Sequence, residues 1–319
     1  MNKTYDILAV GFPLVEIMRT KKGVPFEEPG EFTGPYPSGD TCIMLDVAAR
    51  LGKKCCFIGT VGEDGFGAIV TDRLARDGVD VCYVNRKEGY NTAAVFVRYE
   101  EDGTRQYLDF INNSACMVLG PEDIPAAVVA DSRIVHFSGE IISNCQTGAR
   151  REAMEKTLAS VSKDALVSLD PNFTISIEDM EAVMGPFVKR ADIILPSEGE
   201  AKVLMGTKTD EEACRKLSAQ GKIVALKQGA AGCTIYKGDK KVHAPAYRVE
   251  EVDPTGCGDS FCAGFLYGVL ENWELEKTGQ LANAAGALQA TRLGPMEGAM
   301  YFEEVMEFIK CSRQTEKEE

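Results

Sequence analysis

The sequence predicts a three-layer α/β/α fold, in which helices cover both faces of a mainly parallel sheet and a small second β-sheet forms a lid. Apolar runs of strand length alternate with segments of helical periodicity along most of the chain. Such alternation is typical of parallel sheets, because each parallel connection needs a crossover that is usually a helix. Two segments interrupt the alternation with strand-like patterns of their own, and these predict the separate small sheet.

The strands of the large sheet are predicted where short apolar runs are bounded by polar or turn-forming residues. They cover Ile7–Val10, Cys55–Val61, Ile134–Phe137, Leu166–Leu169, Ile193–Leu195 and Ile223–Leu226. Helices are predicted between them at Thr41–Leu51, Phe66–Asp77, Gln146–Val161, Glu178–Lys189, Glu198–Met205 and Thr209–Ala219. A chain of 319 residues allows one large domain or two small ones. Because the sequence contains no linker, we expect one domain over residues 1–312 and an acidic tail at 313–319.

Residues 12–37 and 90–112 are predicted to form the lid. The strand-like segments Thr92–Tyr99 and Arg105–Ile111 flank Glu101-Asp102-Gly103, and an Asp-Gly pair between two such segments indicates a hairpin. Residues 12–37 carry proline and glycine at short intervals and look extended rather than helical. A small sheet exposes one face unless something covers it, so we expect this one to pack on a ligand, a second subunit, or both.

Composition and charge exclude several classes of function. The formal net charge of −14 and the isoelectric point near 4.8 argue against nucleic acid or an anionic membrane as a partner. Eleven cysteines without a C-x-x-C pair indicate reduced thiols and a cytoplasmic protein, not a disulfide framework or a zinc site. With only His136 and His243 present, a histidine-based metal site or triad is disfavoured. The apolar run Ile7–Val10 is too short for a signal peptide or a membrane span.

The segment Asp253–Phe261 carries the strongest chemical signal in the chain. Two glycines flank a small residue there, and glycine lets the backbone pass close to a ligand with successive N–H groups aimed at one spot. A helical pattern begins at the same place, and a helix N-terminus binds anions. Asp259 would repel a resting phosphate, but it could take a proton from a hydroxyl that attacks the phosphate. The segment therefore predicts phosphoryl transfer to an alcohol, with Asp259 as the base. The anion hole consists of the backbone N–H groups of Gly256, Cys257 and Gly258.

An isolated G-x-G-D string has a simpler interpretation, in which the glycines make a turn and Asp259 only caps the helix, because acidic residues favour the first helical turn. Two other nucleotide-binding folds lack their motifs. A single glycine, Gly11, follows Ile7–Val10, where a dinucleotide-binding fold needs G-x-G-x-x-G. No G-x-x-x-x-G-K-[ST] string occurs in the sequence either.

The longer string resembles the signature of the ribokinase-like sugar kinases, the phosphofructokinase B family. That signature reads close to D-T-x-G-A-G-D-x-F, and this chain departs from it at Pro254 and Cys257. Gly59–Gly67 resembles the family's first glycine signature, and Thr92 matches the start of its lid strand. The resemblance covers about residues 6–300. It implies the ribokinase-like version of the three-layer fold and ATP-dependent phosphorylation of a sugar with Mg²⁺.

The resemblance also implies where ATP and metal ions bind. The segment Ala191–Ala201 resembles the magnesium segment N-x-x-E with Ser197 in place of asparagine, so Glu200 would act on Mg²⁺ through water ligands. Asp253 and the carbonyl of Thr255 occupy positions that hold a monovalent cation such as K⁺ in many relatives. The positions on the ATP side are Lys227, Gly229, Gly232, Asn283 and Gly286. Lys227 is equally consistent with a surface lysine, and Glu200 with an exposed helix-start carboxylate.

On the sugar side, the family uses an early acidic residue, a glycine-containing segment and a residue after the third or fourth strand. The matching positions are Glu16, Gly39, Asp40, Ile43 and Glu140. Carboxylates accept hydrogen bonds from vicinal hydroxyls and reject anions, which favours a neutral sugar. Ile43 stands where the family has asparagine and removes one polar contact. Glu16 and Asp40 are also consistent with ordinary surface acids.

Several alternatives stay open at this point. Gly39–Thr41 and Asp170–Asn172 resemble the 2-keto-3-deoxygluconate kinases, which need cations for the substrate carboxylate. Thr174 stands where those enzymes have an arginine, and Phe110-Ile111 stands where their lid has Tyr-Arg, so that Arg105 is the remaining lid cation. A buried carboxylate without a partner is costly, and a sugar acid is therefore the weaker alternative. A nucleoside kinase and an inactive sugar- or nucleotide-binding homologue are the others. The lids of relatives imply a homodimer.

Overall fold

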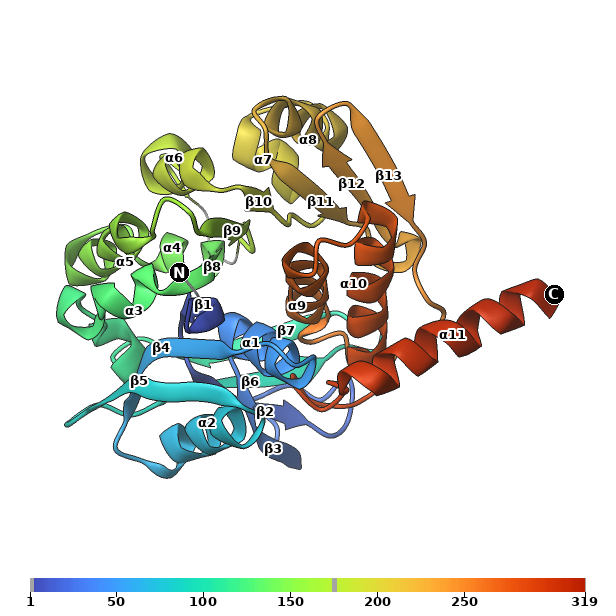
Figure 1. Ribbon diagram of the computed structural model, residues 1–319. Helices are drawn as coiled ribbons and strands as arrows, with labels where there is room; N and C mark the ends of the chain where they lie inside the picture. The colour runs from blue at the N-terminus through green and yellow to red at the C-terminus, as the bar shows by residue number, and fades with distance from the viewer. Residues whose placement is uncertain (1–2, 174–176, 319) are drawn as a thin grey trace.

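The computed structural model describes residues 3–173 and 177–318, with side chains described as far as residue 312. In that part of the chain, nine strands form one sheet and four strands form another (Figure 1). The large sheet has the order β13-β12-β11-β10-β9-β8-β1-β4-β5. Its strands are β1 (Tyr5–Val10), β4 (Cys55–Gly62), β5 (Val79–Lys87), β8 (Ser132–Ser138), β9 (Leu166–Asp170), β10 (Ile193–Ile194), β11 (Ile223–Lys227), β12 (Cys233–Lys237) and β13 (Lys240–Ala244).

The large sheet is parallel from β5 to β11 and antiparallel only where β12 and β13 are added at one edge. All six predicted strands are present, which confirms the mainly parallel sheet. Strands β5, β12 and β13 were not predicted. β5 and β13 are the two edge strands, and β12 lies between β13 and β11. All three carry charged residues such as Arg86, Lys237 and Lys240, so they lack the continuous apolar run of a strand buried on both faces.

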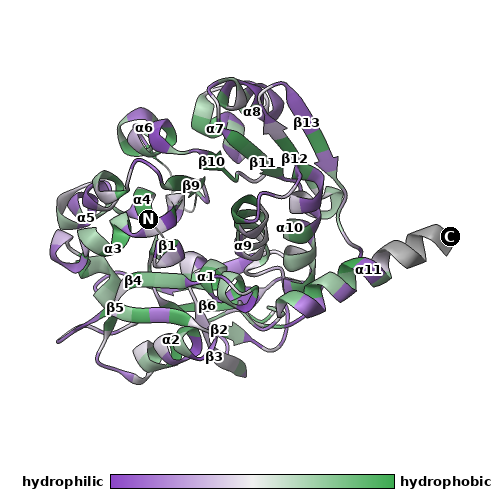
Figure 2. Cartoon of the chain, in the orientation of Figure 1, coloured by the Kyte–Doolittle hydropathy of each residue, from purple (hydrophilic) through white to green (hydrophobic). Residues whose placement is uncertain are grey.

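Helices cover both faces of the large sheet because successive side chains of a strand point to opposite sides. Along β1, Ile7 and Ala9 join one apolar core, whereas Leu8 and Val10 join the other. The first core is completed by α1 (Asp40–Arg50), α2 (Gly65–Arg76), α9 (Cys257–Leu270), α10 (Leu275–Gln289) and α11 (Phe302–Glu318). The second is completed by α3 (Ala126–Ala130), α4 (Gly139–Asn144), α5 (Gly148–Ser160), α6 (Met180–Arg190), α7 (Glu200–Met205) and α8 (Asp210–Ala219). Figure 2 shows apolar colour on the inner strands β11 and β12 and hydrophilic colour on α8.

The small sheet has the strand order β3-β2-β6-β7. Its strands are β2 (Leu14–Arg19), β3 (Phe32–Ser38), β6 (Ala93–Tyr99) and β7 (Arg105–Phe110). The β6–β7 pair is the predicted antiparallel hairpin, and β2 pairs with β6 in parallel. The predicted lid strands are therefore confirmed, although residues 20–31 between β2 and β3 contain no strand.

The tip of the β6–β7 hairpin contacts the loop that precedes α9. The hydroxyl of Tyr99 donates a hydrogen bond to Asp253 Oδ1 over 2.8 Å, and Arg105 Nη1 donates one to Thr255 Oγ1 over 3.0 Å. The lid is thus held against the glycine-rich segment. At the other end of the chain, the backbone of α11 continues to Glu318, so residues 313–318, predicted as a tail, are helical and extend away from the body (Figure 1).

Candidate active site

The glycine-rich segment forms the start of α9, as its pattern predicts. Gly256 is the residue before the helix and has φ 79°, a left-handed conformation that favours glycine. A Cβ at this position would also collide with the carbonyl oxygen of Pro295. The backbone N–H groups at the start of a helix lack partners within the helix, which leaves them available to an anion. The Cys257 N–H makes a long bond of 3.3 Å to the Pro254 carbonyl, so a ligand would have to compete for it.

Asp259 lies in the first turn of α9 and is half-buried. Within the described residues, its carboxylate takes part in no hydrogen bond. Burial raises its pKa well above the usual range, and the charges of Asp40 and Asp170 raise it further, while Lys227 opposes the change. A carboxylate whose pKa is raised is a stronger base, and a base works best when its pKa lies near the working pH.

Asp40 begins α1, after Gly39 with φ 109°. Its Oδ2 accepts hydrogen bonds from the Ser138 hydroxyl and, over 3.1 Å, from Asn172 Nδ2. Glu140 begins the adjacent α4, and its pKa is raised well above the usual range by burial and then by Asp40. The structure therefore brings together Asp40, Glu140 and Asp259, which the family resemblance places on the sugar side and beside the anion hole.

Glu16 joins these acids from strand β2 of the lid, and it is not a surface residue. It is 8% exposed, and its Oε1 accepts a 2.6 Å hydrogen bond from Ser38 Oγ. Burial raises its pKa to about 7, and the charge of Asp253 adds to the effect. Its Oε2 is buried and has no partner among the described residues. Burying an acceptor without a hydrogen-bond partner costs free energy, so Glu16 Oε2 is an acceptor that a ligand hydroxyl could satisfy.

Lys227 is buried at the end of β11, and the alternative of a surface lysine is wrong. Its Nζ lies 2.5 Å from Asp170 Oδ2, and the two side chains are 11% and 5% exposed. Burial opposes the ammonium charge, but Asp170 outweighs it and raises the pKa of Lys227. The same Nζ lies 3.6 Å from where a Cβ on Gly258 would be, so a positive charge lies beside the start of α9.

Sequence reasoning missed Asp170 and its neighbour Cys262 as parts of the site. Cys262 Sγ lies 3.2 Å from Asp170 Oδ2. The sequence held a signal for Asp170, because this acid ends an apolar run and polar residues at the carboxyl ends of parallel strands commonly face a ligand. Asp170 Oδ1 is buried without a partner among the described residues, as is Glu16 Oε2.

Glu200, the predicted magnesium residue, begins α7 and is partly buried. Its two carboxylate oxygens accept backbone N–H bonds from Ser197 over 2.7 Å and from Phe173 over 3.2 Å. Burial raises its pKa, and the charge of Asp170 contributes. These bonds leave lone pairs for water ligands and suit an indirect contact with Mg²⁺. No cluster of three acidic, cysteine or histidine side chains able to hold a metal occurs in the part of the chain that the structure describes.

The remaining predicted ATP-side residues lie in the turn after β11 and along α10, and their contacts are to the end of β13 and to the start of α9. Gly232 has φ 92° and no room for a side chain beside Ala244, and Gly229 has φ 52° in the turn after β11. Asn283 Nδ2 donates to the carbonyls of Ala244 (2.9 Å) and Pro245 (3.0 Å). A Cβ on Gly286 would lie 3.0 Å from the Cys257 carbonyl.

Ile43, predicted on the sugar side, belongs to the core. Its side chain is 2% exposed, and its Cγ2 lies 3.1 Å from where a Cβ on Gly256 would be. Ile43 therefore packs against the loop at Gly256 and makes no polar contact of the kind expected with a substrate. Thr174 lies outside the described residues.

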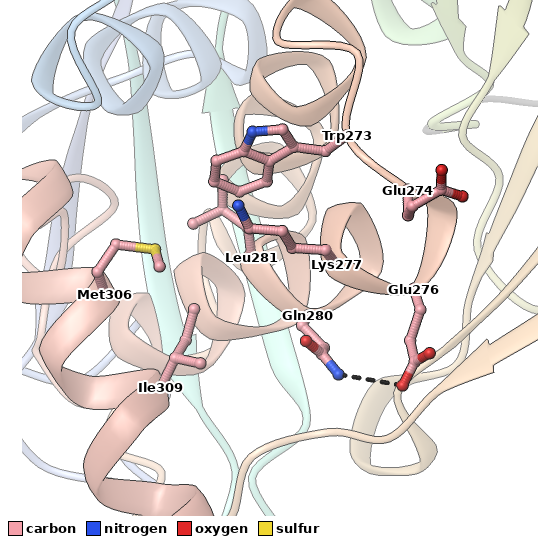
Figure 3. Close-up of a pocket in the computed structure, with 8 residues that line it drawn as sticks. All are labelled: Trp273, Glu274, Glu276, Lys277, Gln280, Leu281, Met306 and Ile309. Atoms are coloured by element: carbon pink, nitrogen blue, oxygen red, sulfur yellow. Dashed lines mark hydrogen bonds between the residues drawn. The ribbon is translucent and has the colours of Figure 1, made fainter.

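Two surface pockets do not involve these residues. One, of about 350 Å³, lies between α10 and α11, where Lys277 lies over the Trp273 ring at 3.3 Å and Met306 and Ile309 face it from α11 (Figure 3). The other, of about 520 Å³, lies beside the lid near Phe110 and the start of α2. None of the predicted site residues lines either pocket.

A glycine-rich helix start, a carboxylate beside it with a raised pKa and a small sheet held against the loop before the helix are the features expected of a phosphotransferase of the three-layer α/β class. The family model of the pfkB carbohydrate kinases matches residues 30–300, and the chain belongs to this family. Probable fructokinase-2 of Arabidopsis thaliana is 30% identical over 320 residues, which cover 95% of each chain. Fructokinase-1 of rice, Oryza sativa subsp. japonica, is 28% identical over 96% of this chain and 98% of that one.

Solved structures agree with the sequence comparisons. A putative ribokinase II from E. coli in complex with ATP and Mg²⁺ superimposes with a TM-score of 0.88 and 35% identity, covering 96% of this chain and 99% of that one. Its apo form gives a TM-score of 0.89. The resemblance found in the sequence and the ribokinase-like fold are confirmed, and the protein is an ATP-dependent carbohydrate kinase. Among the described residues, no helix has the length and apolar character needed to cross a membrane.

Proposed function

We propose that the protein transfers the γ-phosphoryl group of ATP to a hydroxyl of a small neutral sugar. The observation that carries this proposal is the gathering of Glu16, Asp40 and Glu140 near Asp259. These acids offer acceptors for several sugar hydroxyls, including the unused Glu16 Oε2. The charge of a sugar acid would meet repulsion from these carboxylates.

In the proposed mechanism, Asp259 accepts the proton of the attacking hydroxyl. The helix start at Gly256, Cys257 and Gly258 stabilises the negative charge that builds on the transferred group. Lys227 adds positive charge beside Gly258. Mg²⁺, which Glu200 would hold through water, neutralises charge on the phosphates when bound. The lid excludes water, which limits hydrolysis of ATP.

A panel of acceptors tests the proposed substrate class. ADP release would be measured with Mg-ATP and fructose, ribose and other neutral sugars, alongside adenosine, inosine and 2-keto-3-deoxygluconate. We expect activity on a neutral sugar, with fructose the first candidate because curated relatives are named fructokinases. Strong phosphorylation of the sugar acid with none of the neutral sugars would overturn the proposal. Robust activity on a nucleoside alone would select the nucleoside-kinase alternative.

The pKa of Glu16 leads to a prediction about stability and pH. Glu16 has a pKa of about 7 in the folded protein and an ordinary pKa of 4.5 in the unfolded chain. The folded protein therefore binds the proton of the Glu16 carboxyl more tightly than the unfolded chain does. Its contribution to stability is therefore greatest at low pH and is lost as pH rises from about 4.5 to 7. Glu16→Gln keeps an acceptor for Ser38 and removes the titration. At pH 8 we expect the free energy of unfolding of the variant to exceed that of the wild type by about 3 kcal/mol.

Urea unfolding of both proteins at pH 5 and pH 8 measures this difference. The gap between the two free energies should widen with pH. A constant gap would show that Glu16 does not titrate in this range.

We also propose that the lid makes a homodimer and that the protein works in the cytoplasm. The outer side of the lid exposes aromatic rings: Phe110 is 55% and Phe32 is 38% exposed, and both contact Phe96. An apolar patch of this kind is typical of an interface. Sedimentation equilibrium should give twice the chain mass of 34.7 kDa. The eleven cysteines are all free, which suits a reducing compartment.

A further inference from the structure

The buried amide of Gln289, at the end of α10, lies between the two loops that flank the anion hole. The Gln289 side chain is 0% exposed. Its Nε2 donates hydrogen bonds to the carbonyl oxygens of Thr255 (3.0 Å) and Gly294 (2.7 Å), and its Oε1 accepts one from the Gly298 N–H (3.2 Å). If the Gln289 amide were turned round, its oxygen would face the carbonyl oxygens of Thr255 and Gly294, and two acceptors cannot hydrogen-bond each other. These contacts therefore identify the Nε2 end as the donor.

The Thr255 carbonyl is one of the two groups predicted from family resemblance to bind a monovalent cation. The other is the Asp253 carboxylate, which is 0% exposed and accepts three hydrogen bonds. These come from the Tyr99 hydroxyl (2.8 Å), the Thr255 N–H (3.0 Å) and the Gly294 N–H (2.9 Å). A hard cation needs several oxygen atoms free to coordinate it. Here each of these oxygens already accepts at least one hydrogen bond from the chain, so a cation would have to share them with the donors of the protein.

A neighbouring carbonyl is occupied in the same way. Ala290, the residue after Gln289, accepts backbone hydrogen bonds from Val252 (2.8 Å) and Asp253 (3.1 Å). Among the described residues, none of the side-chain atoms of Asp253 or Gln289 is left unpaired, in contrast to Glu16 Oε2 on the sugar side and Asp170 Oδ1 beside Lys227. The pocket predicted for a cation is thus satisfied by hydrogen bonds, whereas the substrate side is not.

A bound cation would also bring positive charge next to the anion hole. Arg105 provides this charge from the lid, since its guanidinium donates to Thr255 Oγ1 over 3.0 Å and acts electrostatically on Cys257. Gln289 thus bridges the carbonyls that a cation would otherwise join, and Arg105 carries the positive charge that a cation would otherwise bring.

We propose that the Gln289 amide replaces the monovalent cation, so that this kinase needs no K⁺ to hold its anion hole. Gln289 acts as a positioning residue: it joins the loop before α9 to the loop at Gly294–Gly298. The inference rests on the proposed kinase reaction for its activity readout. Its stability readout does not depend on that reaction, which keeps the two failures distinguishable.

The first test uses the wild-type protein in KCl, NaCl or choline chloride at equal ionic strength. A cation that binds the folded state raises Tm, and one that does not bind leaves Tm unchanged. We expect the same Tm in all three salts, and kcat/KM for ATP within about twofold. A Tm that rises with K⁺ concentration, or activity that requires K⁺, overturns the inference.

The second test exchanges the bridging donor for an acceptor. Gln289→Glu keeps the shape of the side chain but sets a carboxylate against the carbonyls of Thr255 and Gly294. In choline chloride we expect Tm to fall by about 5 °C or more and kcat/KM for ATP by about tenfold, because two buried hydrogen bonds are lost. Because the altered pocket is lined by oxygens, K⁺ should restore roughly half or more of the lost Tm.

Gln280→Glu is the matched control, because it makes the same chemical change on the same helix. Gln280 lies in the surface pocket of Figure 3 and bonds Glu276. We expect this variant to show no difference between K⁺ and choline. If Gln289→Glu keeps wild-type stability and activity in choline, Gln289 does not hold the anion hole. If the variant does not fold, the wild-type salt comparison alone still decides between the inference and a bound cation.

Discussion

Replacing Asp259 with asparagine should lower kcat by about 10³-fold or more. Asparagine keeps the size of the side chain and its place in the first turn of α9, but it cannot accept the hydroxyl proton. The affinity for Mg-ATP should change little, because the anion hole consists of backbone N–H groups that the substitution leaves in place. Steady-state kinetics with the preferred sugar and a binding titration with Mg-ATP would separate the two effects.

The stability of this variant needs its own measurement, because burial and nearby acids raise the pKa of Asp259. Removing an unfavourable buried charge should stabilise the fold, so a loss of kcat could not be attributed to unfolding. Asp239→Asn, an exposed change in the turn between β12 and β13, serves as the control for lost charge. Turnover of Asp259→Asn at the wild-type rate would remove Asp259 from the role of base.

The second large effect is expected at Lys227. Lys227→Met leaves the Asp170 carboxylate buried without its cation, and breaking a buried ion pair typically lowers the free energy of unfolding by about 3–5 kcal/mol. Activity should also fall, because the positive charge beside Gly258 is lost. Urea unfolding and steady-state kinetics measure the two consequences.

A double variant distinguishes stability from function at this pair. Lys227→Met with Asp170→Leu removes both charges, and an apolar replacement of a buried pair is often neutral. We expect stability to return while activity stays low. The exposed pair Lys241–Glu211 provides the comparison, and Lys241→Met should cost no more than about 1 kcal/mol. Recovery of full activity in the double variant would show that Lys227 has only a structural role.

Much of the site could be predicted because its chemistry lies in short, continuous strings. The left-handed Gly256, the helix start and Asp259 occupy neighbouring positions, and their local geometry follows from glycine and helix rules. The acids Asp40 and Glu140 were found through resemblance to the family, which places polar residues at these two positions. Glu16 was found through resemblance alone, since a single acid in a lid strand has no local signature.

The contacts between residues of the site were not predicted where they join segments distant in the sequence. Asp170 and Lys227 are 57 residues apart and meet because β9 and β11 end on the same edge of the sheet. Ile43 was assigned to the substrate because its position matched a polar one in the family, yet the packing of α1 against α9 places it in the core.

The residue order alone predicted the class of fold and the family and indicated Asp259 as the candidate base, because hydrophobic period and glycine conformation act over a few neighbouring residues. Whether a charged or polar group is free to bind a ligand was decided only by the folded chain. Lys227 proved to be paired, Glu16 to keep an unused oxygen, and the Thr255 carbonyl to be bonded to Gln289. The energy of a polar group depends on its burial and on its partners, and these come together only when distant segments pack.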